Sequence, residues 1–238
     1  MPESRGQVVI VTGASGNLGR AVARTFLRAG AHLVLIDREP ARLERGSPEL
    51  AASDDHQLAV SVDVNDPEAV RSVVETTVRR LGRLDVLVHT VGGYAAGAPV
   101  HETPVAVWDD MWRLNARSAY VVCQAAVPTM RQQGEGRIIM IAARPGLAGR
   151  AQMAAYSAAK AAVIRLTESL SAELRADGIN VNCIVPGTID TPQNRRDMPG
   201  ADPGHWVAPE SLADVIRFLA SDAARDIHGA ALPVYGRS

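Results

Sequence analysis

The stretch "VVIVTGASGNLGRAVARTF" (residues 8–26) decides the fold class. A short β-branched run at 8–12 leads into glycines 13, 16 and 19, and a segment of helical period follows at once. Glycines at such a turn let the backbone approach a pyrophosphate, whose charge then lies against the free N–H groups at the start of the helix. A glycine-rich turn alone is a weak signal, but its place between a strand and a helix favours a nucleotide-binding loop.

The same alternation of apolar runs and helical segments continues to the end of the chain. The runs predict strands at 7–12, 32–36, 58–62, 84–89, 137–142, 179–185 and 230–235. Helical period predicts helices at 17–29, 66–81, 104–131, 153–176 and 209–221, and Gly30, Gly82 and Gly178 stand where three of them should stop. Because the runs are almost continuously apolar, both faces of the sheet should be covered. We therefore expect an α/β Rossmann fold with a doubly wound parallel sheet of about seven strands flanked by helices.

Length alone favours neither one domain nor two, and the absence of a break in composition favours one domain over residues 1–238. Hydrophobic residues make up 47% and charged residues 21%, with a net charge of -1, which suits a sizeable core and offers no basic surface for nucleic acid or an anionic membrane. No secretory leader or membrane-length apolar stretch is visible, so a cytoplasmic location is expected. Cys123 and Cys183 each lie in an apolar run and should be buried thiols, not a disulfide.

One segment, 188–208, breaks the pattern. It reads "TIDTPQNRRDMPGADPGHWVA", which is too polar and too rich in proline for regular structure. A connection of this length after the sixth strand is a candidate substrate lid, although a surface excursion would look the same.

Two residues at the end of the second predicted strand bear on whether the dinucleotide is NAD or NADP. Asp37 follows the glycines by about 20 residues, and a carboxylate there can accept both ribose hydroxyls of NAD and repel the additional phosphate of NADP. Arg38 is the complication, because its guanidinium could bind that phosphate. We favour NAD, and NADP remains the alternative.

Tyr156 and Lys160 carry the chemistry. They stand four apart on the helix predicted at 153–176, so their side chains share a face. A free tyrosine has a pKa near 10, and a lysine cation a few Å away would stabilise its phenolate by up to ~4 kcal/mol. The pair is therefore a candidate for general acid–base catalysis, although the spacing also occurs by chance on many helices.

Six motifs, in order along the chain, resemble those of the short-chain dehydrogenase/reductase (SDR) family. They are "TGASGNLG" (12–19), "VDV" (62–64), "LDVLVHTVGG" (84–93), Asn115, "YSAAK" (156–160) and "NCIVPGTIDTP" (182–192). The resemblance implies an NAD(P)-dependent oxidoreductase that forms a homo-oligomer, a dimer or tetramer, through its long helices. It assigns proton transfer to Tyr156, ribose binding and a lowered tyrosine pKa to Lys160, and a relay water to Asn115. The cofactor residues it implies are Gly13, Ser15, Asn17, Leu18, Gly19, Asp37, Arg38, Asp63, Val64, Val91, Gly92, Tyr156, Lys160, Pro186, Gly187 and Ile189, and no metal is implied.

Three departures from the family pattern stand out. The glycine spacing Gly-x-x-Gly-x-x-Gly is that of extended and atypical branches. His89 and Thr90 replace two largely structural asparagines, and we interpret His89 as a core residue with satisfied hydrogen bonds. Ala143 stands thirteen residues before Tyr156, where most members have a serine that donates to the substrate carbonyl. Loss of such a donor typically costs ~10²–10³ in rate.

The lid segment offers an explanation for Ala143. Its order of residues from 190 to 206 resembles that of dihydropteridine reductase, a family member that also lacks the serine. A conjugated heterocycle would not need a donor that orients a ketone. Tyr94, Trp112 and Trp206 could then line an aromatic slot for a flat ring, although ordinary packing is an equally good reading.

Three functional hypotheses follow. The first is hydride transfer between a nicotinamide and a small carbonyl or conjugated, heterocyclic substrate. The second is a 3-oxoacyl or other ketone reductase in which another donor replaces the serine. The third is a non-catalytic NAD(P)-sensing protein, which the missing serine favours and the retained Tyr156, Lys160 and Asn115 oppose.

Overall fold

A computed structural model describes residues 4, 6–51 and 57–237, and it contains one sheet of seven parallel strands. The strands are β1 (Val8–Thr12), β2 (His32–Asp37), β3 (Gln57–Ser61), β4 (Val86–His89), β5 (Gly136–Ile141), β6 (Ile179–Pro186) and β7 (Ala231–Val234). Their order is β3-β2-β1-β4-β5-β6-β7, so the chain winds outward from β1 in one direction and then from β4 in the other. The expected Rossmann fold and its seven strands are confirmed.

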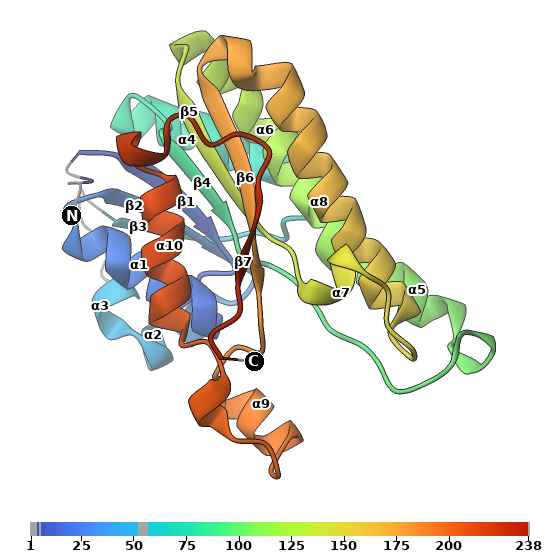
Figure 1. The fold of residues 1–238 in the computed structure, drawn as a ribbon. Coiled ribbons are helices and arrows are strands. Elements are labelled where there is room, and N and C mark those ends of the chain that lie inside the picture. The colour runs from blue at the N-terminus through green and yellow to red at the C-terminus, as the bar shows by residue number, and fades with distance from the viewer. Residues whose placement is uncertain (1–3, 5, 52–56, 238) are drawn as a thin grey trace.

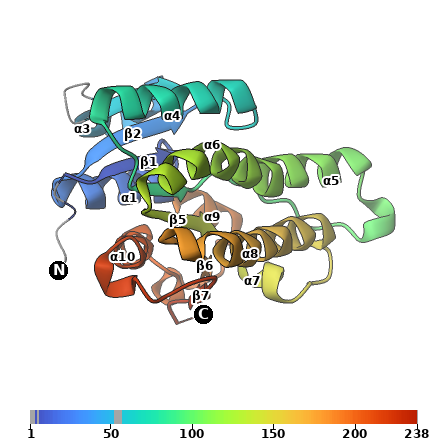
Figure 2. The ribbon, with the colours of Figure 1, turned by 90° about the horizontal axis from the view of Figure 1, so that it is seen from above.

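Ten α-helices accompany the sheet in the described part of the chain. They are α1 (Asn17–Arg28), α2 (Pro40–Gly46), α3 (Pro48–Ala51), α4 (Pro67–Leu81), α5 (Val105–Met111), α6 (Ser118–Gln133), α7 (Arg144–Leu147), α8 (Ala154–Leu174), α9 (Pro192–Asp197) and α10 (Pro209–Leu219). Figures 1 and 2 show α1 and α10 on one face of the sheet and α4, α6 and α8 on the other.

Burial on both faces explains the almost continuous apolar runs. Every residue of β1, β4, β5 and β6 is buried. Successive side chains of a strand point to opposite faces, so Val9 and Val11 join the core under α1 and α10, whereas Ile10 joins the core under α4, α6 and α8. Cys123 and Cys183 are buried free thiols, as expected.

The predicted helix stops are confirmed. Gly30, Gly82 and Gly178 have φ of +83°, +80° and +75°, which is the left-handed region that other residues rarely adopt. At the other end of α4, the Asp66 side chain accepts hydrogen bonds from the N–H groups of Glu68 and Ala69.

The single helix predicted over 104–131 is confirmed as a continuous helical segment, but its middle is a π-helical turn. The structure has α5, then a π-helical turn (Trp112–Arg117), then α6. Asn115 Nδ2 donates to the Met111 carbonyl (2.9 Å) and Ser118 Oγ to the Leu114 carbonyl (2.7 Å), so side chains take up carbonyl groups of the widened turn. Such turns are often found at functional sites.

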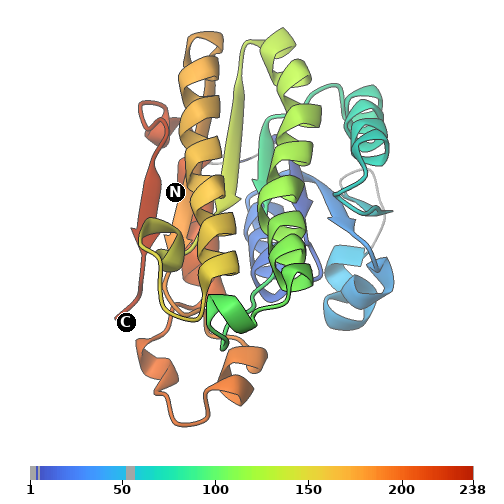
Figure 3. The same cartoon turned by 90° about the vertical axis from the view of Figure 1, so that its right-hand side faces the viewer.

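The interpretation of 188–208 as wholly irregular is wrong. Thr191 caps α9, with its hydroxyl accepting from the Asn194 N–H at 3.1 Å, and Pro192 occupies the first helical position. A β-bridge between Ile189 and Val207 ties the two ends of the segment together. Figure 3 shows this part of the chain projecting beyond the sheet.

Within the described residues, no helix is both long enough and apolar enough to span a membrane.

Candidate active site

The loop after β1 has the tight geometry that its glycines predict. Gly13 has φ of +67°, and the Gly16 N–H donates to its carbonyl over 2.9 Å. A Cβ on Gly19 would collide with that same carbonyl, so only glycine lets α1 start this close to β1. The loop therefore leaves room for a phosphate at the start of α1.

Asp37, the last residue of β2, is bound to this loop. Its Oδ2 accepts from the Ser15 hydroxyl (2.6 Å) and the Ser15 N–H (3.1 Å), and its Oδ1 accepts from the Glu39 N–H (3.1 Å). These three donors hold the carboxylate at the edge of the glycine loop. The remaining lone pairs are available to hydroxyl groups of a ligand.

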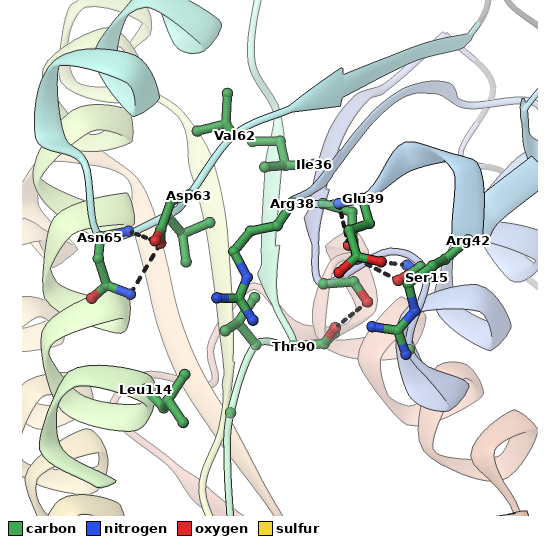
Figure 4. Close-up of a pocket in the computed structure, with 16 residues that line it drawn as sticks. Ser15, Ile36, Arg38, Glu39, Arg42, Val62, Asp63, Asn65, Thr90 and Leu114 are labelled. Carbon is green, nitrogen blue, oxygen red and sulfur yellow. Dashed lines mark hydrogen bonds between the residues drawn. The ribbon is translucent and has the colours of Figure 1, made fainter. Parts of the chain in front are cut away.

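A pocket of about 200 Å³ opens between this carboxylate and the ends of β3 and β4. In Figure 4 the Arg38 side chain reaches across it between Asp63 and Thr90, and Arg42 lies beside Ser15. Hydrogen bonding to Asn65, with Arg38 also contributing, holds the pKa of Asp63 below its usual range. Among the sequence-predicted residues, the pocket brings together Gly13, Ser15, Asp37, Arg38, Asp63, Val64, Val91 and Gly92. The motifs also contain Gly16, Val62 and Thr90, which line the pocket although no cofactor role was assigned to them, and the remaining lining lies outside the motifs, namely Ile36, Glu39, Arg42, Asn65 and Leu114.

At the far end of the pocket, three predicted residues converge. A Cβ on Gly92 would lie 2.9 Å from Asn115 Oδ1 and 3.2 Å from Lys160 Nζ. Asn115 exchanges hydrogen bonds with the main chain of Gly93: its Oδ1 accepts at 3.2 Å and its Nδ2 donates at 3.1 Å. Since Nδ2 also donates to Met111, both side-chain N–H groups of Asn115 are used within the protein.

Lys160 is 5% exposed and donates from Nζ to the Ile141 carbonyl over 2.8 Å. It is the only lysine among the 25 basic residues of the chain. Burial lowers its pKa to about 8, because the charged form loses hydration that one carbonyl only partly replaces.

Tyr156 does not have the lowered pKa that the family resemblance implies. Burial raises its pKa to about 12, and the neighbouring Tyr94 adds to the effect. Lys160 Nζ lies 6.0 Å from the Tyr156 ring centroid and is directed to Ile141, so in this structure it does not offset the loss of water around the phenol. A group bound beside the two side chains would have to supply the stabilisation.

Ala143 is buried at the end of β5, where it precedes α7. The nearby Ser157 Oγ is buried and has no hydrogen-bond partner among the residues that the structure describes.

His89 is 2% exposed, and both ring nitrogens have partners, Thr12 Oγ1 at 2.8 Å and Ser118 Oγ at 3.1 Å. The interpretation of His89 as a satisfied core residue is confirmed. Burial, with the Lys160 charge nearby, lowers the pKa of His89 to about 3, so the ring is neutral.

Several predicted cofactor residues lie outside the pocket lining. The side chain of Leu18 packs in the core under α1, and Asn17 accepts from Arg20 at 3.0 Å. Pro186 ends β6, the Gly187 N–H donates to Val234, and Ile189 forms the bridge at the base of the lid segment.

The aromatic residues considered as lining for a flat ring have different neighbours. Tyr94 meets Tyr156 edge to face, with ring centroids 5.0 Å apart. Trp112 instead stacks on Trp108 at 6.2 Å and is 44% exposed. Gly236 packs on the main chain of Trp206.

These features suit a dinucleotide. The glycine turn has room for phosphates, and Asp37 has acceptor capacity for a ribose. At position 92 only glycine leaves the space beside Asn115 and Lys160 open, because any side chain would fill it.

Comparison with known proteins agrees with this reading. Residues 7–201 match the family model described as short chain dehydrogenase. The chain belongs to the short-chain dehydrogenase family. As a member of it, the protein is an NAD(P)-dependent oxidoreductase that acts on alcohol or carbonyl substrates.

Individual short-chain dehydrogenases match over almost the whole chain. A cis-4-hydroxycyclohexanecarboxylate dehydrogenase from Sinomonas cyclohexanicum is 34% identical over 97% of this chain and 95% of that protein. A 2-(R)-hydroxypropyl-CoM dehydrogenase from Xanthobacter autotrophicus is 34% identical over 97% of both chains. The crystal structure of an NAD⁺-bound xylitol dehydrogenase has a TM-score of 0.90 at 28% identity and covers 99% of this chain and 100% of its own.

Proposed function

We propose that the protein is an NAD-dependent dehydrogenase of a small hydroxy compound, with Tyr156 as the proton-transferring group. The observation that carries the proposal is the close approach of Asn115 and Lys160 to Gly92, where a Cβ would lie 2.9 Å from Asn115 Oδ1 and 3.2 Å from Lys160 Nζ, at the end of a pocket that starts at the glycine loop. The names of both curated relatives are those of hydroxy-acid or hydroxyalkyl dehydrogenases, which supports an alcohol as the substrate.

Each side chain of the candidate site has a separate role in the proposed reaction. Nicotinamide, when bound, supplies the hydride acceptor. Tyr156 takes the proton of the substrate hydroxyl in oxidation and returns it in reduction. Lys160, whose Nζ is directed to the Ile141 carbonyl in the protein alone, would stabilise the phenolate with its positive charge once a bound ligand brings Nζ toward Tyr156. The side chain of Asn115 is occupied by Gly93 and Met111, so a relay water would have to bind its main-chain carbonyl, which also accepts a long hydrogen bond (3.5 Å) from Ser118 Oγ.

Asp37 supports NAD as the preferred coenzyme. Its carboxylate is held by Ser15, so a 2′-phosphate placed there would face a fixed negative charge. Arg38 and Arg42 line the same pocket and could weaken this discrimination.

A coenzyme and substrate screen tests the proposal. We expect kcat/KM for NAD⁺ to exceed that for NADP⁺ by roughly tenfold or more, which corresponds to ~1.4 kcal/mol, with a cyclic hydroxy acid or another secondary alcohol, because Asp37 would repel the additional phosphate. Turnover is followed as absorbance of the reduced nicotinamide. Coenzyme binding without turnover on alcohols, ketones and quinonoid dihydropterin would support the sensor hypothesis in place of ours.

A substitution at Ala143 distinguishes between two classes of substrate. A ketone or alcohol enzyme that lacks the serine should gain from its return, so Ala143→Ser should raise kcat on alcohols by roughly tenfold to a hundredfold. A dihydropteridine-like substrate, which the register of the lid favours, needs no such donor and should show no gain. Activity on quinonoid dihydropterin that is unchanged by Ala143→Ser, with none on alcohols, would contradict the alcohol proposal.

We also propose that the protein is a homo-oligomer, a dimer or tetramer, paired through α5, α6 and α8. Large apolar side chains are exposed on the first two helices and the turn between them, where Val105 is 74%, Trp108 44% and Tyr120 54% exposed. Their grouping favours an interface. Light scattering should give about two or four times the 25.2 kDa chain mass, and a monomer would contradict this part of the proposal.

A further inference from the structure

A buried chain of hydrogen bonds joins the ends of β1 and β4 to the turn that carries Asn115. Thr12 Oγ1, at the end of β1, lies 2.8 Å from His89 Nδ1. His89 Nε2 lies 3.1 Å from Ser118 Oγ, at the start of α6, and that hydroxyl lies 2.7 Å from the Leu114 carbonyl. Thr12, His89 and Ser118 are each 2% exposed or less.

The donor and acceptor capacity of each group fixes the direction of this chain. A carbonyl oxygen only accepts, so the single proton of Ser118 Oγ points to Leu114. Toward His89 the Ser118 oxygen is then an acceptor, and Nε2 must carry the ring proton. Nδ1 accepts in turn from the Thr12 hydroxyl. Each group in the chain is satisfied only in this arrangement.

The end of this chain adjoins the candidate active site. Leu114 and Ser118 flank Asn115 within the π-helical turn and the first residue of α6. Asn115 is tied to Gly93, four residues after His89, and a Cβ at the intervening Gly92 would touch both Asn115 Oδ1 and Lys160 Nζ. With so little free space, a small displacement of the turn alters the position of Asn115 relative to Lys160.

We infer that His89, as its neutral Nε2–H tautomer, is a positioning residue that holds the turn Trp112–Arg117 against the end of β4 and so sets the place of Asn115 beside Lys160. The inference rests on the proposed dehydrogenase function. His89 acts through Ser118 and Leu114, without contact with the reacting atoms, so it is not a catalytic residue.

A pair of matched variants at Thr12 tests this role. Thr12→Val keeps the branched shape and removes the hydroxyl, whereas Thr12→Ser keeps the hydroxyl and removes a methyl group. We expect Thr12→Val to lower kcat roughly tenfold, because small misplacements of catalytic groups are costly, and to leave the Kd of NADH within about twofold. Thr12→Ser should keep kcat within about threefold. Lower melting temperatures with unchanged kcat in Thr12→Val would indicate a merely structural role and overturn the inference.

The tautomer can be measured without turnover. In protein labelled with ¹⁵N-histidine, the ring signals of His89 are assigned by their loss in His89→Asn. We expect a protonated Nε2 and an unprotonated Nδ1 near neutral pH, and a proton on Nδ1 would overturn the inference. A wild-type protein that turns over no substrate would contradict the proposed function, whereas the ring signals report on His89 alone.

Discussion

Single buried residues set the chemistry of this site, and Lys160 is the clearest case. It is the only lysine in a chain whose other basic residues are arginines, and it is 5% exposed. Arginine stays charged at any accessible pH, whereas a buried lysine can lose its proton. Burial lowers the pKa of Lys160 and raises that of Tyr156, so in the protein alone both groups are biased toward their neutral forms.

The pKa of Lys160 can be measured directly. We expect the ¹³Cε signal of lysine-labelled protein to titrate with a midpoint near pH 8, where burial places the pKa, and not near its usual 10.5. Because the chain has one lysine, the signal needs no assignment. A midpoint at the usual value would show that Nζ is hydrated and would contradict the burial of this group.

The same shift links stability to pH. Between about pH 8 and 10.5 the unfolded chain holds the Lys160 proton more tightly than the folded chain, so wild-type stability should rise with pH in that window. Below pH 8 the buried charge of Lys160 lowers the free energy of unfolding by the full ~3 kcal/mol that corresponds to this pKa shift. Lys160→Met removes this charge, so it should be more stable than wild type at pH 7 and lose that advantage by pH 10.5. Urea midpoints of both proteins measure this, and an advantage that does not change with pH would contradict it.

At the scale of elements, hydrophobic periodicity predicted the strands and the ends of the long helices, which depend on local sequence. The β-branched runs and the glycines that end helices located all seven strands and the stops of α1, α4 and α8, because burial on both faces and positive φ each leave a mark in sequence. The π-helical turn left no such mark. Its carbonyls are satisfied by Asn115 and Ser118, and which side chains do so depends on contacts with Gly93 and His89 across the fold.

Short elements were missed for a different reason. The helices α2, α3 and α9 have seven, four and six residues, too few for a helical period to repeat. Thr191-Pro192 was nevertheless a readable start signal within the lid segment. Gln152, the only residue other than glycine with positive φ in the described chain, lies just before α8 and bonds through its carbonyl to Gly97.

At the scale of the site, the order of the motifs identified the candidate residues, but only the structure showed which of them lie close together. The sequence singled out Gly92, Asn115 and Lys160 separately, and the structure places Asn115 Oδ1 and Lys160 Nζ within about 3 Å of where a Cβ on Gly92 would lie. Nothing in the sequence indicated that Tyr156 would have a raised pKa, because both its burial and the electrostatic effect of Tyr94 depend on residues that are distant in sequence.

Over the whole molecule, the sheet order brings the parts of the site together. The chain reverses its winding between β1 and β4, and ligands of such sheets bind beyond the carboxyl ends of the strands at that reversal. Residues that follow β1, β2, β3 and β4 line the pocket of Figure 4. The lid segment projects from the end of β6 at the same edge, as Figure 3 shows.

The central claim is that Tyr156 moves the proton in an NAD-dependent reaction, and Tyr156→Phe tests it most directly. The variant keeps the ring that packs on Tyr94 and removes only the hydroxyl. With the best substrate of the screen, kcat should fall by ~10²–10⁴, because general acid–base catalysis contributes that much, while the Kd of NADH stays within about twofold. A Tyr156→Phe enzyme that retains the wild-type kcat would contradict the account.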